Sequence, residues 1–171
     1  EVLVDQFTGG AHCCAITRLY HFDGSAYTGS LTVWGNYGYS LEDLDGDGLP
    51  ELSSFDDRFA YTFTAYVYSV PPIQIWRFAA GALTDVTRSF PALVRRDLKG
   101  NWKLLQKLAK QRDDIRGVAA AWQADKYLLG EEEDGWATLR DLRAQGLLGG
   151  FGPWARGFAY LRELRTFLEK A

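Results

Sequence analysis

The chain has 171 residues, of which 47% are hydrophobic and 24% are charged, and its formal net charge is −3. This composition supports a buried core, and it excludes a disordered chain, a collagenous rod and a small disulfide scaffold. No apolar run approaches the roughly 18 residues of a membrane span, and the sequence starts at Glu1 with no Met and no leader, so we expect a mature or trimmed chain.

Residues 1–90 are typical of antiparallel β structure. They hold 16 of the 25 aromatic residues, and their 11 acidic and 4 basic side chains give a net charge of −7. β-branched and aromatic residues form short runs that Gly, Asp, Asn and Pro separate, and Asp-Gly turns between such runs favour hairpins. The predicted strands are residues 2–7, 15–22, 31–34, 51–55, 61–70 and 73–78.

Residues 91–171 predict four helices, and their 11 acidic and 15 basic side chains give a net charge of +4. The helix-start signals are Pro91, Asp113 or Asp114, the acidic run 131–134, and Pro153. Gly100 and Asn101 should break or kink the first helix. The fold class is therefore α+β, with an antiparallel β half (1–90) and a helical half (91–171) that we expect to pack together as one compact unit.

The most informative segment is Asp-Leu-Asp-Gly-Asp-Gly-Leu-Pro-Glu at residues 43–51, which we call the aspartate loop. Ca²⁺ takes six to eight oxygen ligands, and the spacing of the loop suits it. The expected ligands are the carboxylates of Asp43, Asp45, Asp47 and Glu51 and the main-chain carbonyl of Leu49. The twelfth position is Ser54, which cannot give the bidentate grip of an EF-hand, and the flanking segments look extended rather than helical.

This pattern resembles the DxDGDGxxE calcium loops of FG-GAP and VCBS repeats, which occur in propeller blades and in secreted bacterial proteins. The resemblance covers only residues 31–55, and it implies the same five ligands. One loop in 90 residues cannot make a closed propeller, so we expect a single blade-like sheet. The competing interpretation is a solvated turn, because Asp-Gly pairs are common in hairpins.

The only two cysteines, Cys13 and Cys14, are adjacent. They are compatible with two reduced thiols on opposite faces of a strand, with a vicinal disulfide that would indicate an oxidising compartment, or with metal or redox chemistry shared with His12. The sequence leaves these three alternatives open.

No nucleophile elbow, phosphate-binding loop or dinucleotide motif is present in the sequence. Acidic residues interrupt the basic excess of the helical half, which argues against nucleic-acid binding. We expect a secreted or periplasmic, calcium-stabilised, non-catalytic binding module with an unknown protein or glycan partner and no membrane span. The alternative is a hydrolase of an extracellular polymer that uses a carboxylate pair near Asp56 and Asp57.

Overall fold

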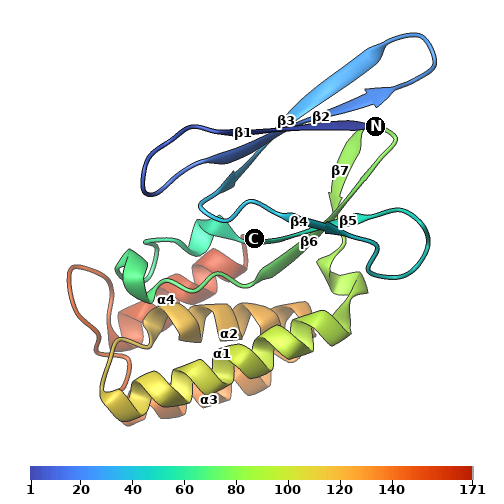
Figure 1. Cartoon of the computed structure of the whole chain (residues 1–171). Helices are drawn as coiled ribbons and strands as arrows, with labels where there is room; N and C mark the ends of the chain where they lie inside the picture. The colour runs from blue at the N-terminus through green and yellow to red at the C-terminus, as the bar shows by residue number, and fades with distance from the viewer. Residues whose placement is uncertain (171) are drawn as a thin grey trace. The chain divides into compact units, whose positions relative to one another are not determined.

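The computed structural model describes residues 1–170, and within them all strands precede residue 86 and all α-helices follow residue 90 (Figure 1). The α+β class is therefore confirmed. The chain forms two units, a β unit (Glu1–Asp57 and Ile73–Ser89) and a helical unit (Arg58–Pro72 and Phe90–Ala171). The segment from Arg58 to Pro72 thus belongs with the helices, although it precedes residue 90.

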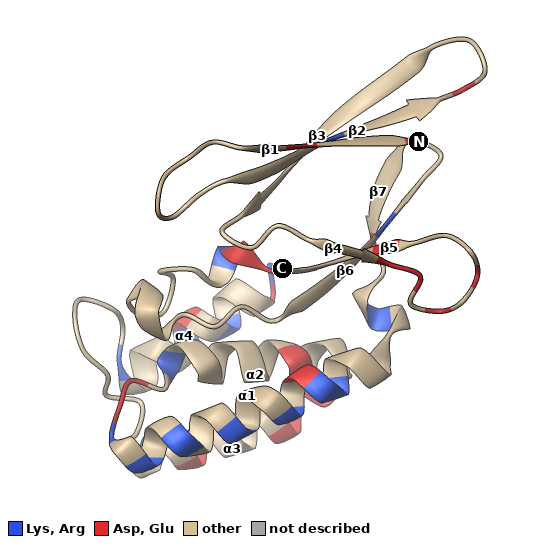
Figure 2. Ribbon diagram, viewed as in Figure 1, with Lys and Arg blue, Asp and Glu red and all other residues tan. Residues whose placement is uncertain are grey.

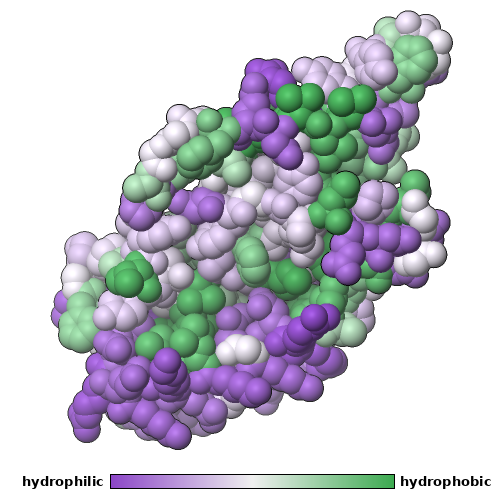
Figure 3. Space-filling model, viewed as in Figure 1, coloured by the Kyte–Doolittle hydropathy of each residue, from purple (hydrophilic) through white to green (hydrophobic). Residues whose placement is uncertain are grey.

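The first sheet of the β unit is an antiparallel meander of β1 (Val2–Phe7), β2 (Ala15–Phe22) and β3 (Tyr27–Gly35). Successive side chains alternate between its two faces, as the strand period requires. Thr17 and Leu19 of β2 face the core and are buried. The opposite face leaves apolar side chains exposed, among them Val4 and Leu31. Figure 3 shows hydrophobic residues at the surface in the region of this sheet.

The second sheet is an antiparallel meander of β4 (Ser40–Glu42), β5 (Glu51–Phe55), β6 (Ile73–Ala79) and β7 (Ala82–Asp85). β4 and β7 are short strands that the sequence did not predict. Neither sheet closes into a barrel or propeller. The core of the β unit is a cluster of four buried side chains, Leu19, Trp34, Leu52 and Phe78.

The helical unit contains α1 (Pro91–Gln111), α2 (Arg116–Leu128), α3 (Glu132–Ala144) and α4 (Gly157–Leu168). The predicted break at Gly100 and Asn101 is wrong, because α1 runs through both residues. Asn101 is buried there, and its Nδ2 donates to Asp125 Oδ2 of α2 (2.9 Å), so a tertiary contact outweighs its weak helix propensity. Pro153 also lies outside α4, which starts four residues later.

The predicted strand over residues 61–70 is wrong. This segment consists of turns and a short 3₁₀ helix (Tyr66–Tyr68), and Tyr61 has a positive φ of 60°. Phe63 is buried in the core of the helical unit, and the Thr64 hydroxyl donates to Asp114 Oδ2 (2.6 Å). Packing against the helices therefore overrides the alternating pattern of this segment.

No helix among residues 1–170 has the length and apolar character needed to cross a membrane.

Candidate metal centre

The aspartate loop connects β4 to β5, which pair with Glu42 opposite Glu51. The predicted hairpin context is therefore present, although its first strand is β4 rather than residues 31–34. Acidic side chains are concentrated in this loop (Figure 2). Its backbone turns at two glycines with positive φ, Gly46 (78°) and Gly48 (88°), which only glycine adopts without steric cost.

The loop's aspartates accept hydrogen bonds from its own backbone. Asp43 accepts the N–H groups of Gly46 on Oδ1 (2.8 Å) and of Gly48 on Oδ2 (3.0 Å). Asp45 and Asp47 each accept the N–H group two residues further on (3.1 and 2.8 Å). These bonds curl the chain around its acidic side chains, as Asp side chains commonly do in turns.

Three of the five predicted ligands come together. Asp43, Asp45 and Glu51 each offer a carboxylate oxygen, and the three oxygens lie within 4.8 Å of one another. Asp47 does not belong to this group. The ligand expected from Leu49 is its main-chain carbonyl rather than its side chain, and its N–H donates to Asp47 Oδ1 (2.8 Å).

Glu51 is the buried member of the group, with no exposed surface. Its Oε2 accepts the N–H of Leu44 (2.9 Å), and its Oε1 accepts Nε of Arg77 (2.8 Å) and a second bond from Arg77 Nη2. A buried carboxylate is costly unless it is paired and hydrogen-bonded, and Glu51 meets both conditions.

Arg77 is the residue that the sequence analysis missed. It lies on β6 directly opposite Glu51, and its Nη2 also donates to Asp45 Oδ2 (2.7 Å) and lies 3.5 Å from Asp47 Oδ2. The hydrogen bond from Arg77 lowers the pKa of Asp45, and the pKa of Arg77 is raised, chiefly by Glu51. Only the register of β5 and β6 brings Arg77 to the loop, so no local signal could have identified it.

The donor set of this group suits a hard cation, because every ligand atom is an oxygen and no nitrogen or sulfur donor belongs to it. Within residues 1–170, Arg77 is the one basic side chain that pairs with the loop. A single guanidinium therefore faces the four carboxylates of residues 43, 45, 47 and 51. Most of the negative charge of the loop is left without a counter-ion from the chain.

Asp56 and Asp57, the pair of the alternative hydrolase prediction, do not join this group. Asp57 Oδ1 accepts the Asn36 Nδ2 group (2.7 Å) and the Asn36 N–H (3.2 Å), and its side chain lies against Gly35, where a Cβ would clash. Asp56 is buried. The two hydrogen bonds of Asp57 fix the position of Asn36, the first residue after β3.

Cys13 and Cys14 lie in the turn between β1 and β2 rather than on a strand, so strand alternation does not separate them. Their sulfur atoms form a vicinal disulfide across a cis peptide bond. The backbone of Cys14 makes two hydrogen bonds to Thr8, from its N–H to Oγ1 (2.8 Å) and from the Thr8 N–H to its carbonyl (3.1 Å). These bonds fasten the two ends of the turn together.

Comparison with known proteins finds a family match in the helical unit. Residues 94–146 match the family described as the sll0997 C-terminal domain, a segment that runs from α1 past the end of α3. The aspartate loop lies outside the matched residues.

Two curated proteins are similar over a longer stretch. The "Probable thylakoid lumen protein sll0997" of Synechocystis sp. is 34% identical over 143 residues, which cover 81% of this chain and 42% of that protein. The "Uncharacterized protein y4bJ" of Sinorhizobium fredii is also 34% identical over 143 residues, which cover 81% of this chain and 22% of that protein. The chain thus spans less than half the length of either relative. No solved structure matches the chain.

Proposed function

We propose that this chain is a calcium-stabilised, non-catalytic binding module that works outside the cytoplasm. The observation that carries the proposal is the convergence of carboxylate oxygens from Asp43, Asp45 and Glu51 within 4.8 Å. Like charges brought this close repel one another, and a divalent cation removes the repulsion.

Asp43, Asp45 and Glu51 would hold the ion, with Asp47 and the main-chain carbonyl of Leu49 as the remaining ligands that the resemblance to FG-GAP and VCBS loops implies. The bound ion would supply charge neutralisation and a fixed loop conformation. Arg77 would compete with it for Glu51 and Asp45, because its guanidinium contacts both carboxylates.

Two observations support a secreted, periplasmic or lumenal location. The Synechocystis relative is named a thylakoid lumen protein. The Cys13–Cys14 disulfide is typical of compartments that do not keep thiols reduced. The proposed calcium site would suit such a location, because weak calcium sites of extracellular modules operate at millimolar calcium. The partner of the module would be a protein or a glycan, and no observation at Asp56 and Asp57 favours the hydrolase alternative.

Thermal unfolding with and without Ca²⁺, with Mg²⁺ as control, tests the proposal. A ligand that binds only the folded state stabilises it by about 2.7 kcal/mol at 100 times its Kd, so the melting temperature of the β unit should rise by several degrees in Ca²⁺ and less in Mg²⁺. The variant Asp43→Asn should lose most of this rise. Glu42→Gln, an exposed acid beside the loop, is the matched control and should keep it.

The variant Arg77→Gln tests whether Ca²⁺ or Arg77 alone neutralises the carboxylates of the aspartate loop. Without Ca²⁺ this variant should melt at a lower temperature, because buried Glu51 loses its charged partner. In Ca²⁺ it should recover, so that its calcium-induced rise exceeds that of the wild type. If the variant loses the same number of degrees with and without Ca²⁺, and the wild type shows no calcium-induced rise, Arg77 is the only counter-ion and the proposal fails.

A further inference from the structure

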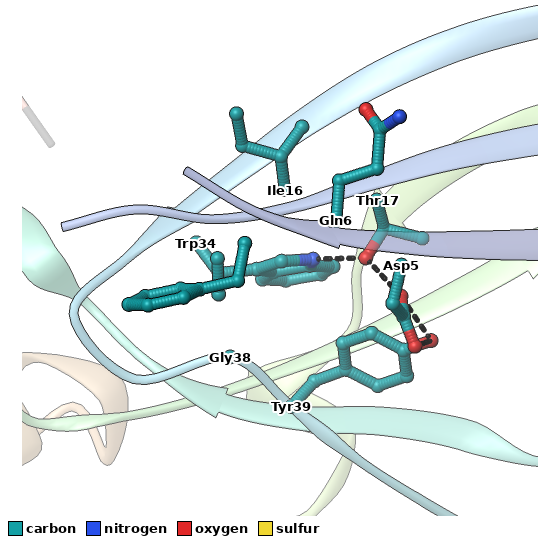
Figure 4. Close-up of a pocket in the computed structure, with 9 residues that line it drawn as sticks. Asp5, Gln6, Ile16, Thr17, Trp34, Gly38 and Tyr39 are labelled. Atoms are coloured by element: carbon teal, nitrogen blue, oxygen red, sulfur yellow. Dashed lines mark hydrogen bonds between the residues drawn. The ribbon is translucent and has the colours of Figure 1, made fainter. Parts of the chain in front are cut away.

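A second feature of the β unit lies apart from the aspartate loop. It is a cavity of 310 Å³, at the small end of the size range of ligand pockets. Figure 4 shows the part of its lining that carries the polar contacts, where β1 and β2 contribute Asp5 and Thr17, β3 contributes Trp34, and the chain after β3 contributes Tyr39. Phe7 and Ala15, at the ends of β1 and β2, complete the apolar part of the wall.

The polar groups of the cavity form one connected network that ends on Asp5 (Figure 4). Trp34 Nε1 donates to Thr17 Oγ1 (2.8 Å), and the Thr17 hydroxyl donates to Asp5 Oδ1 (2.7 Å). The Tyr39 hydroxyl lies 3.0 Å from Asp5 Oδ1 and 3.2 Å from Oδ2. The Trp34 N–H and the hydroxyl groups of Thr17 and Tyr39 therefore all have an acceptor within the network. The two hydroxyl groups donate directly to the Asp5 carboxylate, and Trp34 donates to Thr17.

Asp5 has no cationic partner in the part of the chain that the structure describes, since none of the ion pairs of residues 1–170 includes it. The neutral hydroxyl groups of Thr17 and Tyr39 both contact Asp5 Oδ1, and that of Tyr39 also contacts Oδ2. A carboxylate has about four acceptor positions, so one position on Oδ2 is left. Burial raises the pKa of Tyr39, and the hydrogen bond and negative charge of Asp5 raise it further. Asp5 is exposed to solvent, and its carboxylate, which lines the cavity, can accept from one more donor and pairs with no basic side chain of residues 1–170.

Aromatic rings form the rest of the site. The rings of Trp34 and Tyr39 lie 5.2 Å apart at an angle of 42°. Phe7 also lines the cavity and is 68% exposed, a large exposure for a phenylalanine on a strand. The faces of aromatic rings carry negative electrostatic potential and attract organic cations, and a set of such rings is the usual receptor for quaternary ammonium groups.

We propose that this cavity binds a small organic cation with a methylated ammonium group, of the choline type. An anion would be repelled by Asp5, and a neutral polyol would find no free donor in the network, which leaves the Gln6 amide as the one other side-chain donor of the lining. A methylated ammonium needs only a negative charge and aromatic faces, which Asp5, Phe7 and Tyr39 supply. The proposal is independent of the calcium site, because the cavity shares no residue with the aspartate loop.

Calorimetric titration of the whole chain with choline tests this site, with 3,3-dimethylbutan-1-ol, the uncharged carbon analogue of choline, as the matched control ligand. Choline and tetramethylammonium should bind, and the alcohol should bind at least about tenfold more weakly. Equal binding of choline and the alcohol would overturn the proposal, since the cavity would then recognise apolar surface alone.

Two variants address the two parts of the site. Asp5→Asn should weaken choline binding about tenfold, and Phe7→Leu should weaken it about threefold to fivefold. The controls are Glu42→Gln and Phe22→Leu, which change an exposed acid and an exposed aromatic residue that do not line the cavity, and both should bind as the wild type does. Wild-type affinity in both Asp5→Asn and Phe7→Leu would refute the assignment.

Asp5→Asn changes a hydrogen-bonded network, so its fold is checked by circular dichroism. If this variant does not fold, Phe7→Leu decides the question, because the Phe7 side chain makes no hydrogen bond. Co-sedimentation with phosphatidylcholine vesicles, against phosphatidylglycerol vesicles, then identifies the source of the ligand. Retention on phosphatidylcholine that choline displaces would indicate a lipid headgroup, and choline binding without retention would indicate a free small molecule.

Discussion

Asp125 of α2 allows a test of the electrostatics of the helical unit. Its side chain has no exposed surface, its Oδ2 accepts Nδ2 of Asn101 (2.9 Å), and its Oδ1 accepts no hydrogen bond from residues 1–170. Burial raises the pKa of Asp125 to about 8, the negative charge of Asp97 adds to this rise, and the bond from Asn101 opposes it. Asp125 is therefore protonated in the folded protein at neutral pH.

This shift makes stability depend on pH with a definite sign. In the unfolded chain the carboxyl group has its ordinary pKa of 3.8, so between about pH 4 and pH 8 the folded state holds a proton that the unfolded state has released. The free energy of unfolding then falls by about 1.4 kcal/mol per pH unit as pH rises through this window. At pH 7 the accumulated cost is about 4 kcal/mol by the same relation, as an order of magnitude.

Asp125→Asn replaces the protonated carboxyl by a neutral amide of the same shape that does not titrate. We expect the variant to exceed the wild type in stability by about 4–5 kcal/mol at pH 7.5 and by only about 1 kcal/mol at pH 4.5. Urea unfolding followed by circular dichroism at both pH values measures the difference. Asp141→Asn, at an exposed position of α3, is the control and should show no such growth with pH. A stability difference that stays constant between the two pH values would refute the reasoning.

Two further predictions concern the start of α2. Arg116 is fully buried, and its guanidinium donates two hydrogen bonds to the Asp114 carboxylate (2.9 and 2.5 Å). Arg116→Leu leaves that buried carboxylate without its partner, so it should lower the free energy of unfolding, measured in urea, by about 3–5 kcal/mol. A loss below about 1 kcal/mol would contradict this account. A Cβ at Gly117 would lie 2.0 Å from the carbonyl oxygen of Tyr68, so Gly117→Ala should cost more than about 2 kcal/mol. Gly100→Ala, in open space on α1, should instead gain up to about 1 kcal/mol, and equal effects of the two substitutions would disprove the steric argument.

Local patterns identified much of the fold. The runs at residues 2–7, 15–22 and 51–55 became β1, β2 and β5 with the predicted bounds, because β-branched content and turn residues act over a few neighbouring positions. The same local logic predicted the aspartate loop, since its acidic residues and glycines are contiguous. Residues 61–70 show the limit, because their alternation is real but Phe63 and Thr64 find their partners on the helices.

The sequence by itself determined the fold class and the acidic loop, because helix period, strand alternation and turn chemistry are properties of short segments. Only the tertiary structure decided which side chains meet. Arg77 reaches Glu51 across 26 residues, Asn101 reaches Asp125 across 24, and Tyr39 reaches Asp5 across 34. Such pairs depend on strand register and helix packing, and those are set by burial of the whole core rather than by any pattern along the chain.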